Sequence, residues 1–297
     1  MKRWAFAALF LSGVLWGLGF PLGKAALKEV DASQLVLLRF AFASLVALPF
    51  ALRTAEARAL FRSPLAVGNG LVYGLAFLVQ FEGLARTSVS LAALIVGIMP
   101  ALIAVGARLL GEPVSRLSWA GVAAASVGAA FIAGRPGGGA TPFGLVLDLG
   151  ALFLFLTWLL TLRRIPRGSN PIILPAVNVI VAGLVLLPLS LVLHGAPKLD
   201  LSLTAWLAIA VQGVFCTLLP TAAWQFGAAR VGSATAGIFV NLEPLIGAVI
   251  GVAVFGDHLG VGLIAGGALI VAGSVVVVLG ERGTTAPDLV EAPSPLT

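Results

Sequence analysis

The chain consists of long apolar runs separated by short polar segments. Ten of the runs are long enough to cross a bilayer, whose core needs roughly 20 apolar residues per helix. They lie at about 4–23, 33–52, 64–84, 87–107, 117–134, 142–162, 169–193, 203–227, 231–255 and 260–280. Backbone groups in lipid must be satisfied within their own segment, and the alternation typical of barrel strands is missing. The pattern therefore predicts an all-α integral membrane protein with ten transmembrane helices.

Composition supports lipid as the solvent. Hydrophobic residues make up 60% of the chain and charged residues only 10%, whereas soluble proteins carry about 25% charged residues. The mean hydropathy is +1.09. Although the net charge is +6, the basic residues are scattered between the apolar runs. A nucleic-acid binder would gather them on one face, so no nucleic-acid partner is expected.

Loop charges indicate how the predicted helices are oriented. With the N-terminus inside, 12 of the 18 Lys and Arg fall on the cytoplasmic side and five on the other, with Arg39 left within a span. Membrane proteins concentrate Lys and Arg in cytoplasmic loops. We therefore expect cytoplasmic N- and C-termini in a multi-pass protein of the cell membrane, that is, the plasma or inner membrane.

The two halves of the chain resemble each other. Residues 83–100, GLARTSVSLAALIVGIMP, align with residues 227–244, GAARVGSATAGIFVNLEP, so that Pro100 meets Pro244. One residue further out of register, Gly121 meets Gly266 and Gly128 meets Gly273. Matched positions of this kind predict an internal repeat rather than chance similarity between apolar segments.

The repeat predicts the domain organisation. Residues 1–135 form the first five-helix repeat, 136–281 the second, and 282–297 a disordered cytoplasmic tail. Because five is odd, the second repeat enters the membrane from the opposite side. The result is a pair of inverted repeats, an architecture common among secondary transporters.

Several motifs, in this order, resemble one transporter family. They are LWGLGFPLGK in the first predicted helix, GLARTSVSLAALIVGIMP leading into LLGEPVS, and NLEPLIGAVIGVAVFGD near the end. The chain is similar to the EamA-type permeases of the drug/metabolite transporter superfamily over nearly its whole length. The resemblance implies a small-molecule permease or exporter with a central cavity between the halves. It does not imply a particular substrate.

Glu243 is the main candidate for chemistry. It lies in the middle of an apolar segment, where an ionised group costs a few kcal/mol. In one interpretation it faces the cavity and either exchanges a proton or binds a substrate ammonium. In the other it is structural and supports the helix break at Pro244. The sequence favours neither.

Pro100 and Pro244 are the predicted hinges. A proline within a helix lacks an N–H and frees the carbonyl four residues earlier, which is that of Val96 or Val240. Broken helices at corresponding positions of two halves often mark the transport site. An ordinary kink whose carbonyls are satisfied by neighbouring helices is the alternative.

Arg39 and Asp148 form a second candidate pair. Each lies seven residues into its predicted span from the outer end, and each is costly in lipid on its own. An ion pair or a shared polar cavity would lower that cost. The pair would act as an outer gate or as a structural strut, and the sequence does not decide between them.

Among the polar and aromatic residues at depth, Trp16, Asn241 and Gln225 are the favoured cavity residues. The chain shows none of the common catalytic or phosphate-binding motifs, so no enzyme activity, metal or cofactor is expected. Its two histidines lie in predicted outer loops.

The sequence predicts a secondary transporter acting by alternating access, with export as the expected direction. Because only Arg39 is deeply placed, we expect small neutral, zwitterionic or cationic solutes, such as amino acids or their analogues. Proton coupling is one option if Glu243 titrates. An uncoupled facilitative permease is the alternative, and a channel is disfavoured because no ring or filter signature is present. Whether the protein is a monomer or a homodimer stays undecided.

Overall fold

A computed structural model describes residues 2–111, 113–134, 140–166, 170–231, 236, 239–258 and 260–281. Throughout these residues the regular elements are helices, which confirms the predicted all-α class. The predicted disordered tail, 282–297, lies outside the described residues.

The first part of the chain comprises α1 (Lys2–Ala26), α2 (Ala32–Arg53), α3 (Ala55–Arg62), α4 (Pro64–Ala85), α5 (Val89–Val96), α6 (Met99–Leu109) and α7 (Arg116–Gly134). The second part comprises α8 (Pro142–Leu162), α9 (Ile173–His194), α10 (Leu203–Gly213), the π-helix η1 (Val214–Leu218), α11 (Leu219–Val231), α13 (Leu242–Phe255) and α14 (Val261–Glu281). The short helix α3 lies in a segment that the sequence reading treated as a loop.

Eight segments of the described chain are long and apolar enough to cross a membrane. They are Arg3–Ala26, Ala32–Arg53, Pro64–Ala85, Val89–Leu109, Pro142–Leu162, Ile173–His194, Leu203–Arg230 and Val261–Gly280. The apolar helix α13 is shorter, with 14 residues, and α7 is not among the eight. The chain is thus a multi-pass membrane protein, while the count of ten remains a prediction.

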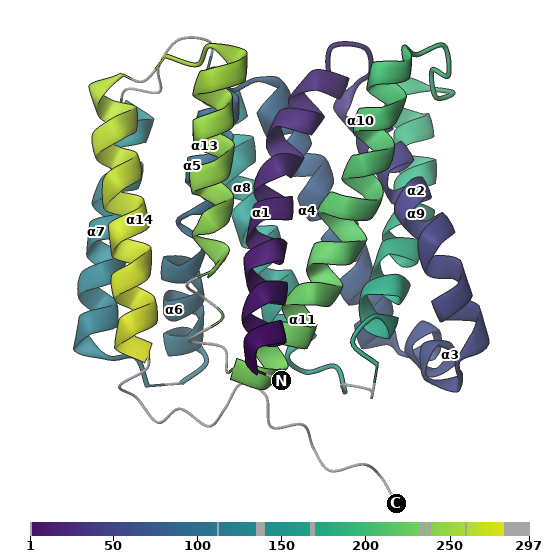
Figure 1. Ribbon diagram of the computed structural model, residues 1–297, viewed down its shortest axis with the longest axis horizontal. Helices are drawn as coiled ribbons and strands as arrows, with labels where there is room; N and C mark the ends of the chain where they lie inside the picture. Colours follow the sequence, from purple (N-terminus) through teal and green to yellow (C-terminus); the bar gives the residue numbers. More distant parts are fainter. Residues whose placement is uncertain are drawn as a thin grey trace, which may run out of the picture.

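The helices stand side by side as one bundle (Figure 1). The chain enters at the lower edge of Figure 1, where α3 lies and where α14 also ends. We call this the N-terminal side and the other edge the distal side. Leu45, Leu184 and Val249 are exposed on the bundle at 63%, 65% and 66%. Large exposed apolar side chains in such number suit contact with lipid rather than water.

Hydroxyl side chains begin several of the helices. In each case the side-chain oxygen accepts a hydrogen bond from a backbone N–H of the first turn, which has no partner within the helix. The residues are Thr54 before α3, Ser63 before α4, Ser88 before α5, Thr141 before α8 and Ser202 before α10. These caps mark the points at which the chain turns back into the bundle.

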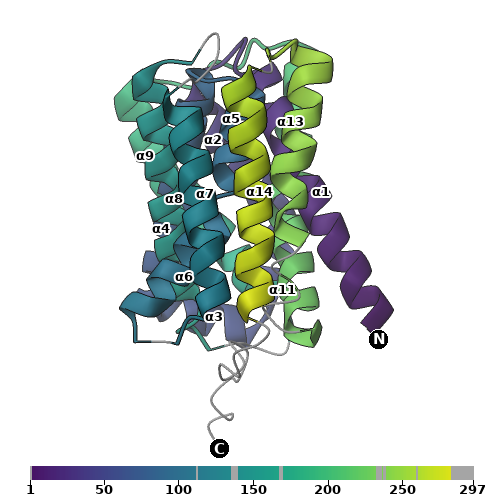
Figure 2. The ribbon, with the colours of Figure 1, turned by 90° about the vertical axis from the view of Figure 1, so that its left-hand side faces the viewer.

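Glycines bring α7 and α14 into close contact along much of their length, as Figure 2 shows from the side. A Cβ on Gly121 would lie 2.5 Å from the carbonyl oxygen of Gly273, and a Cβ on Gly128 would lie 2.5 Å from that of Gly266. Only glycine permits such an approach of two helix backbones.

Candidate functional site

A cavity of about 240 Å³ lies within the bundle, lined by helices from both parts of the chain. Its walls are mainly aromatic and aliphatic, with a few polar groups, as is typical of small-molecule sites. The rings that line it are those of Trp16, Phe20, Tyr73, Phe77, Phe81, Phe155, Trp158 and Trp224. Its polar lining includes Arg39, Gln80, Arg163 and Glu243.

The cavity extends toward the N-terminal side. Its lining reaches Leu162 at the end of α8, Ala228 near the end of α11 and Val278 near the end of α14. At the distal side the lining on α1 ends at Phe20, six residues before that helix ends. On α2 and α4 the lining includes Arg39 and Phe81, which lie nearer the distal ends of those helices.

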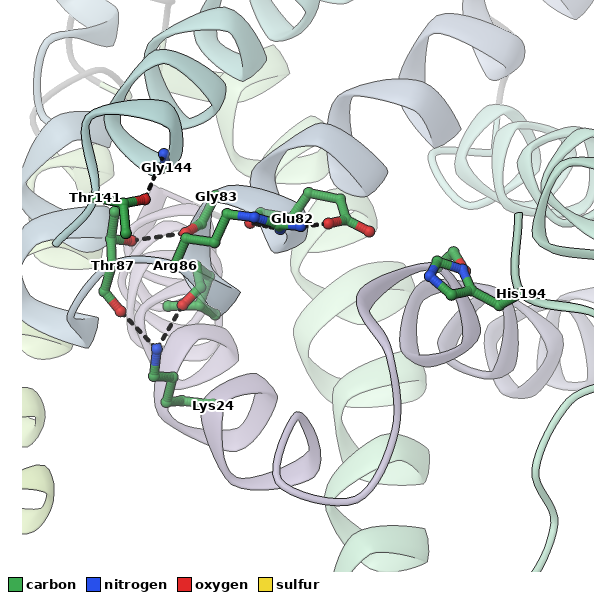
Figure 3. Close-up of polar contacts among 10 residues, drawn as sticks. Lys24, Glu82, Gly83, Arg86, Thr87, Thr141, Gly144 and His194 are labelled. Atoms are coloured by element: carbon green, nitrogen blue, oxygen red, sulfur yellow. Dashed lines mark hydrogen bonds and ion pairs between the residues drawn. The ribbon is translucent and has the colours of Figure 1, made fainter. Parts of the chain in front are cut away.

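Polar contacts close the distal end (Figure 3). The ammonium of Lys24 donates to the carbonyl oxygens of Leu84 at 2.6 Å and Thr87 at 2.5 Å. The hydroxyl of Thr87 donates to the carboxylate of Asp148 at 2.9 Å. These bonds connect α1, the turn after α4 and α8 above the cavity. A side chain at Gly23 would also collide with the ring of Phe81, so the helices are already in close contact there.

The predicted ion pair between Arg39 and Asp148 is wrong. Arg39 lines the cavity and bonds to η1, whereas Asp148 accepts from Thr87 and is not part of the cavity lining. Similar depth did not bring the two side chains together, because α2 and α8 each pack against α4 and the two side chains have different partners. Asp148 belongs to the distal closure instead. Glu82 and Arg86, four residues apart near the end of α4, form a local ion pair with 2.5 Å between the charged atoms (Figure 3).

Arg39 is 2% exposed and is held on two of its three nitrogens. Its Nε donates to the hydroxyl of Thr217 at 2.6 Å, and its Nη2 donates to the carbonyl of Cys216 at 2.9 Å. Both acceptors come from η1. A π-helical turn shifts the backbone pairing and is common at functional sites. The guanidinium also lies over the ring of Phe77, 4.2 Å from its centroid.

Glu243 lines the cavity, as one of its two interpretations requires. Its side chain is partly buried and makes no hydrogen bond with the residues that the structure describes. It lies in the first turn of α13, after the chain is interrupted at the buried residue Asn241. Asn241 is not part of the cavity lining.

Trp16 lines the cavity, with its ring centroid 5.7 Å from that of Trp224. Gln225, the other predicted residue of this region, follows Trp224 on α11 but lies outside the lining. On another wall of the cavity, Trp158 stacks on Tyr73 with 4.8 Å between their centroids. Trp158 lies near the position that the repeat pairs with Trp16, and this proximity was a signal that could have pointed to it.

Both predicted hinge prolines lie next to helix interruptions. The break after α5 falls at Gly97 and Ile98, and Pro100 stands in the first turn of α6, where its missing N–H costs nothing. Pro244 stands in the first turn of α13. The hydroxyl of Ser274 donates to the carbonyl oxygen of Gly97, which compensates the broken helical pairing.

Arg163 is the cavity residue that the sequence reading missed most clearly. It follows the last residue of α8 and was assigned to a cytoplasmic loop, yet it lines the cavity. Its place in a cluster of loop arginines gave no signal that it differs from its neighbours. In the described part of the chain, no group of three or more His, Cys, Asp or Glu residues is arranged to hold a metal ion.

A bundle of apolar helices around a central cavity defines a multi-pass membrane protein with a small-molecule cavity, and comparison with known families identifies it further. The model of the EamA-like transporter family matches residues 3–134 and again residues 142–279. The chain therefore belongs to the EamA-like transporter family.

Two further comparisons were made, with curated proteins and with solved structures. No curated protein matches the chain. Among solved structures, one described as the crystal structure of a protein matches with a TM-score of 0.66 and 21% identity. The match covers 94% of this chain and 98% of that one. At this level of identity the likeness establishes the shared fold alone.

Proposed function

We propose that the protein is a secondary transporter that exports small zwitterionic, neutral or cationic metabolites by alternating access through the central cavity. The observation that carries the proposal is the cavity itself, which both parts of the chain line and which contains Arg39 and Glu243 at its wall. Amino acids and their analogues are the solute class that such a wall suits best, because an apolar side chain would fit among the rings.

The proposed architecture is ten spans in two inverted repeats, 1–135 and 136–281. Two observations support it. The family model matches twice along the chain, once in each part. In addition, α5 and α6 run from the distal to the N-terminal side, whereas α13, their counterpart by alignment, runs the other way (Figure 1). Rocking of the halves about the cavity would then expose it alternately to the two sides.

The breaks at Pro100 and Pro244 are the proposed hinges of this motion. Each lies beside the cavity, since Val96, Pro100 and Val240 belong to its lining. A helix interruption concentrates backbone rotation at a few residues, as hinges of closing domains do.

Glu243 is the proposed proton carrier. A carboxyl group in the cavity that makes no hydrogen bond with the described residues is available to exchange a proton with the solute's ammonium group or with water. Inward movement of a proton would then drive outward movement of the solute. The membrane is proposed to be the plasma or inner membrane, with both termini cytoplasmic.

Solute flux into and out of proteoliposomes tests the proposal. The reconstituted protein is presented with a panel of amino acids, amines and uncharged metabolites, with and without a pH gradient. Saturable flux of at least one panel member supports a transporter. Ion conductance at channel rates, or flux no different from protein-free liposomes for the whole panel, contradicts it.

The orientation of the halves is tested separately. In a background in which Cys216 is replaced by Ala, a cysteine is introduced at Arg86 or at Arg230, and whole cells are treated with a membrane-impermeant maleimide. The inverted architecture predicts labelling of the Arg86→Cys protein from outside and protection of the Arg230→Cys protein. Labelling of both from the same side contradicts it.

A further inference from the structure

The burial of the Arg39 guanidinium within the bundle is energetically unfavourable. Arg39 is 2% exposed, eight residues into α2, and no carboxylate lies within ion-pair distance of it in the described part of the chain; the carboxylate of Glu243 interacts with it only at longer range. A buried charge without a close partner costs several kcal/mol. If Arg39 were only a strut between α2 and η1, a neutral donor would hold the same two acceptors at lower cost.

The hydrogen bonds of Arg39 leave one edge of the guanidinium unused. Nε and Nη2 are held by Thr217 and by the carbonyl of Cys216, but Nη1 is buried and has no hydrogen-bond partner among the described residues. An unpaired buried donor itself costs about 1–3 kcal/mol. Because η1 and the ring of Phe77 fix the group from two sides, its orientation is set before any ligand arrives.

A second unpaired donor belongs to the same cavity. The indole Nε1 of Trp158 is buried without a hydrogen-bond partner among the described residues, although Trp158 also lines the cavity. Ring contacts connect it to Arg39, because Phe77 lies against Tyr73 with 5.0 Å between centroids and Tyr73 stacks on Trp158. The cavity lining thus includes two residues with buried donors that lack partners, one of them cationic, and an anionic oxygen is the acceptor that suits the cationic one best.

We infer that Arg39, assisted by Trp158, binds the carboxylate of the transported solute, so that the protein selects carboxylate-bearing zwitterions over amines and amides. This inference rests on the proposed function and narrows its substrate class. Arg39 would act as the anionic-group site and Glu243 as the ammonium site of one cavity.

Fluorescence titration of the purified full-length protein tests the inference. Trp16, Trp158 and Trp224 line the cavity, so a bound ligand should change the intrinsic emission. The probes are L-leucine, N-acetyl-L-leucine and L-leucinamide, together with the same three derivatives of phenylalanine and glutamine. The first two forms of each keep the carboxylate, and the amide lacks it.

For at least one of the three amino acids, the wild-type protein should bind the forms that keep the carboxylate at least about tenfold more tightly than the amide. This ratio is expected for one charge-assisted hydrogen-bond pair. Arg39→Met should abolish this preference and Arg39→Lys should restore part of it. Arg53→Met, which alters an exposed arginine at the end of the same helix, should keep it. A purely structural role for Arg39 would change overall stability but not the ratio between acid and amide.

Equal or tighter binding of the amides, a preference that survives Arg39→Met, or no binding of any carboxylate probe would overturn the inference. If Arg39→Met does not fold, the ratio of acid to amide affinity in the wild type still tests the inference. Thr217→Val, which removes the acceptor of the Arg39 Nε, should lower that ratio. Saturable flux of amines alone in proteoliposomes would refute the carboxylate site while leaving the transporter standing. A carboxylate preference without any flux would refute the transporter instead.

Discussion

Gly121 of α7 and Gly273 of α14 lie backbone to backbone, so that a Cβ on either would meet the carbonyl oxygen of the other. A Cβ on Gly128 would likewise meet the carbonyl oxygen of Gly266. In the sequence repeat, Gly121 corresponds to Gly266 and Gly128 to Gly273. Exchanging the halves therefore turns one contact into the other, which is the pattern expected of a two-fold axis between equivalent surfaces.

This packing predicts that Gly121→Ala destabilises the protein. The new methyl group would lie 2.5 Å from the carbonyl oxygen of Gly273 and force the two helices apart, at a cost of about 1–3 kcal/mol. Gly68→Ala is the matched control, because a Cβ there meets nothing within 4 Å. Thermal unfolding in detergent can be followed with a thiol-reactive dye, since the chain's one cysteine, Cys216, is buried. A melting temperature for Gly121→Ala as high as that of Gly68→Ala would contradict the packing.

The distal closure predicts a role for Lys24 in access to the cavity. Replacing Lys24 by Met removes its bonds to the carbonyl oxygens of Leu84 and Thr87, and the distal end should open more often. Cys216, which lines the cavity, then reacts faster with an impermeant maleimide added from outside. Lys28→Met is the control, because Lys28 is exposed on the turn after α1 and its ammonium makes no hydrogen bond with the described residues, lying only 5.9 Å from the ring centroid of Phe255. Equal labelling rates for both variants would exclude this role.

The helix break after α5 predicts a specific cost for the loss of Ser274. Its hydroxyl is the donor to the carbonyl oxygen of Gly97, so Ser274→Ala leaves a buried acceptor unpaired and should destabilise by about 1–3 kcal/mol. Ser126→Ala is the matched control, because that hydroxyl is exposed and donates only to Val122 within its own helix. Equal melting temperatures for Ser274→Ala and Ser126→Ala would show that the Ser274 hydroxyl does not stabilise the helix break after α5.

Glu29, on the turn between α1 and α2, predicts a pH dependence. Its carboxylate accepts from the hydroxyl and the backbone N–H of Ser202, at 2.6 and 2.8 Å, and these bonds lower the pKa of Glu29. A lowered pKa contributes stability above the ordinary glutamate value of about 4.3, and that stability is lost as the pH falls through the lowered value. The wild type should therefore melt above Glu29→Gln at pH 7, and the gap should close toward pH 3. A gap that widens on acidification would contradict the assignment.

The helical class and most span boundaries could be predicted because lipid forces long apolar helices. The prediction for 33–52, for example, corresponds to α2 at Ala32–Arg53. The break before Pro100 was located only to within a few residues, since proline marks an interruption without fixing which residue turns. The amphipathic helix α3 was missed because eight residues are too short to stand out among loop charges.

The candidate site was predictable in part. Glu243, Trp16 and Arg39 line the cavity because a costly or large polar residue in an apolar span has few other places to lie. Arg39 and Asp148 were paired on depth alone, but depth does not say which face of a helix carries a residue. The π-helical turn that holds Arg39 left no mark in the sequence pattern, and Arg163 was hidden among loop arginines.

Solute movement driven by a pH gradient tests most directly whether the central cavity is a proton-coupled transport site. Proteoliposomes containing the wild type or Glu243→Gln are loaded with a solute identified from the panel, and its efflux is measured with and without an opposing proton gradient. The wild type should accelerate efflux under the gradient, whereas Glu243→Gln should retain exchange of solute for solute and lose the response to the gradient. Full gradient-driven efflux by Glu243→Gln would contradict the assignment of this carboxyl group to proton coupling.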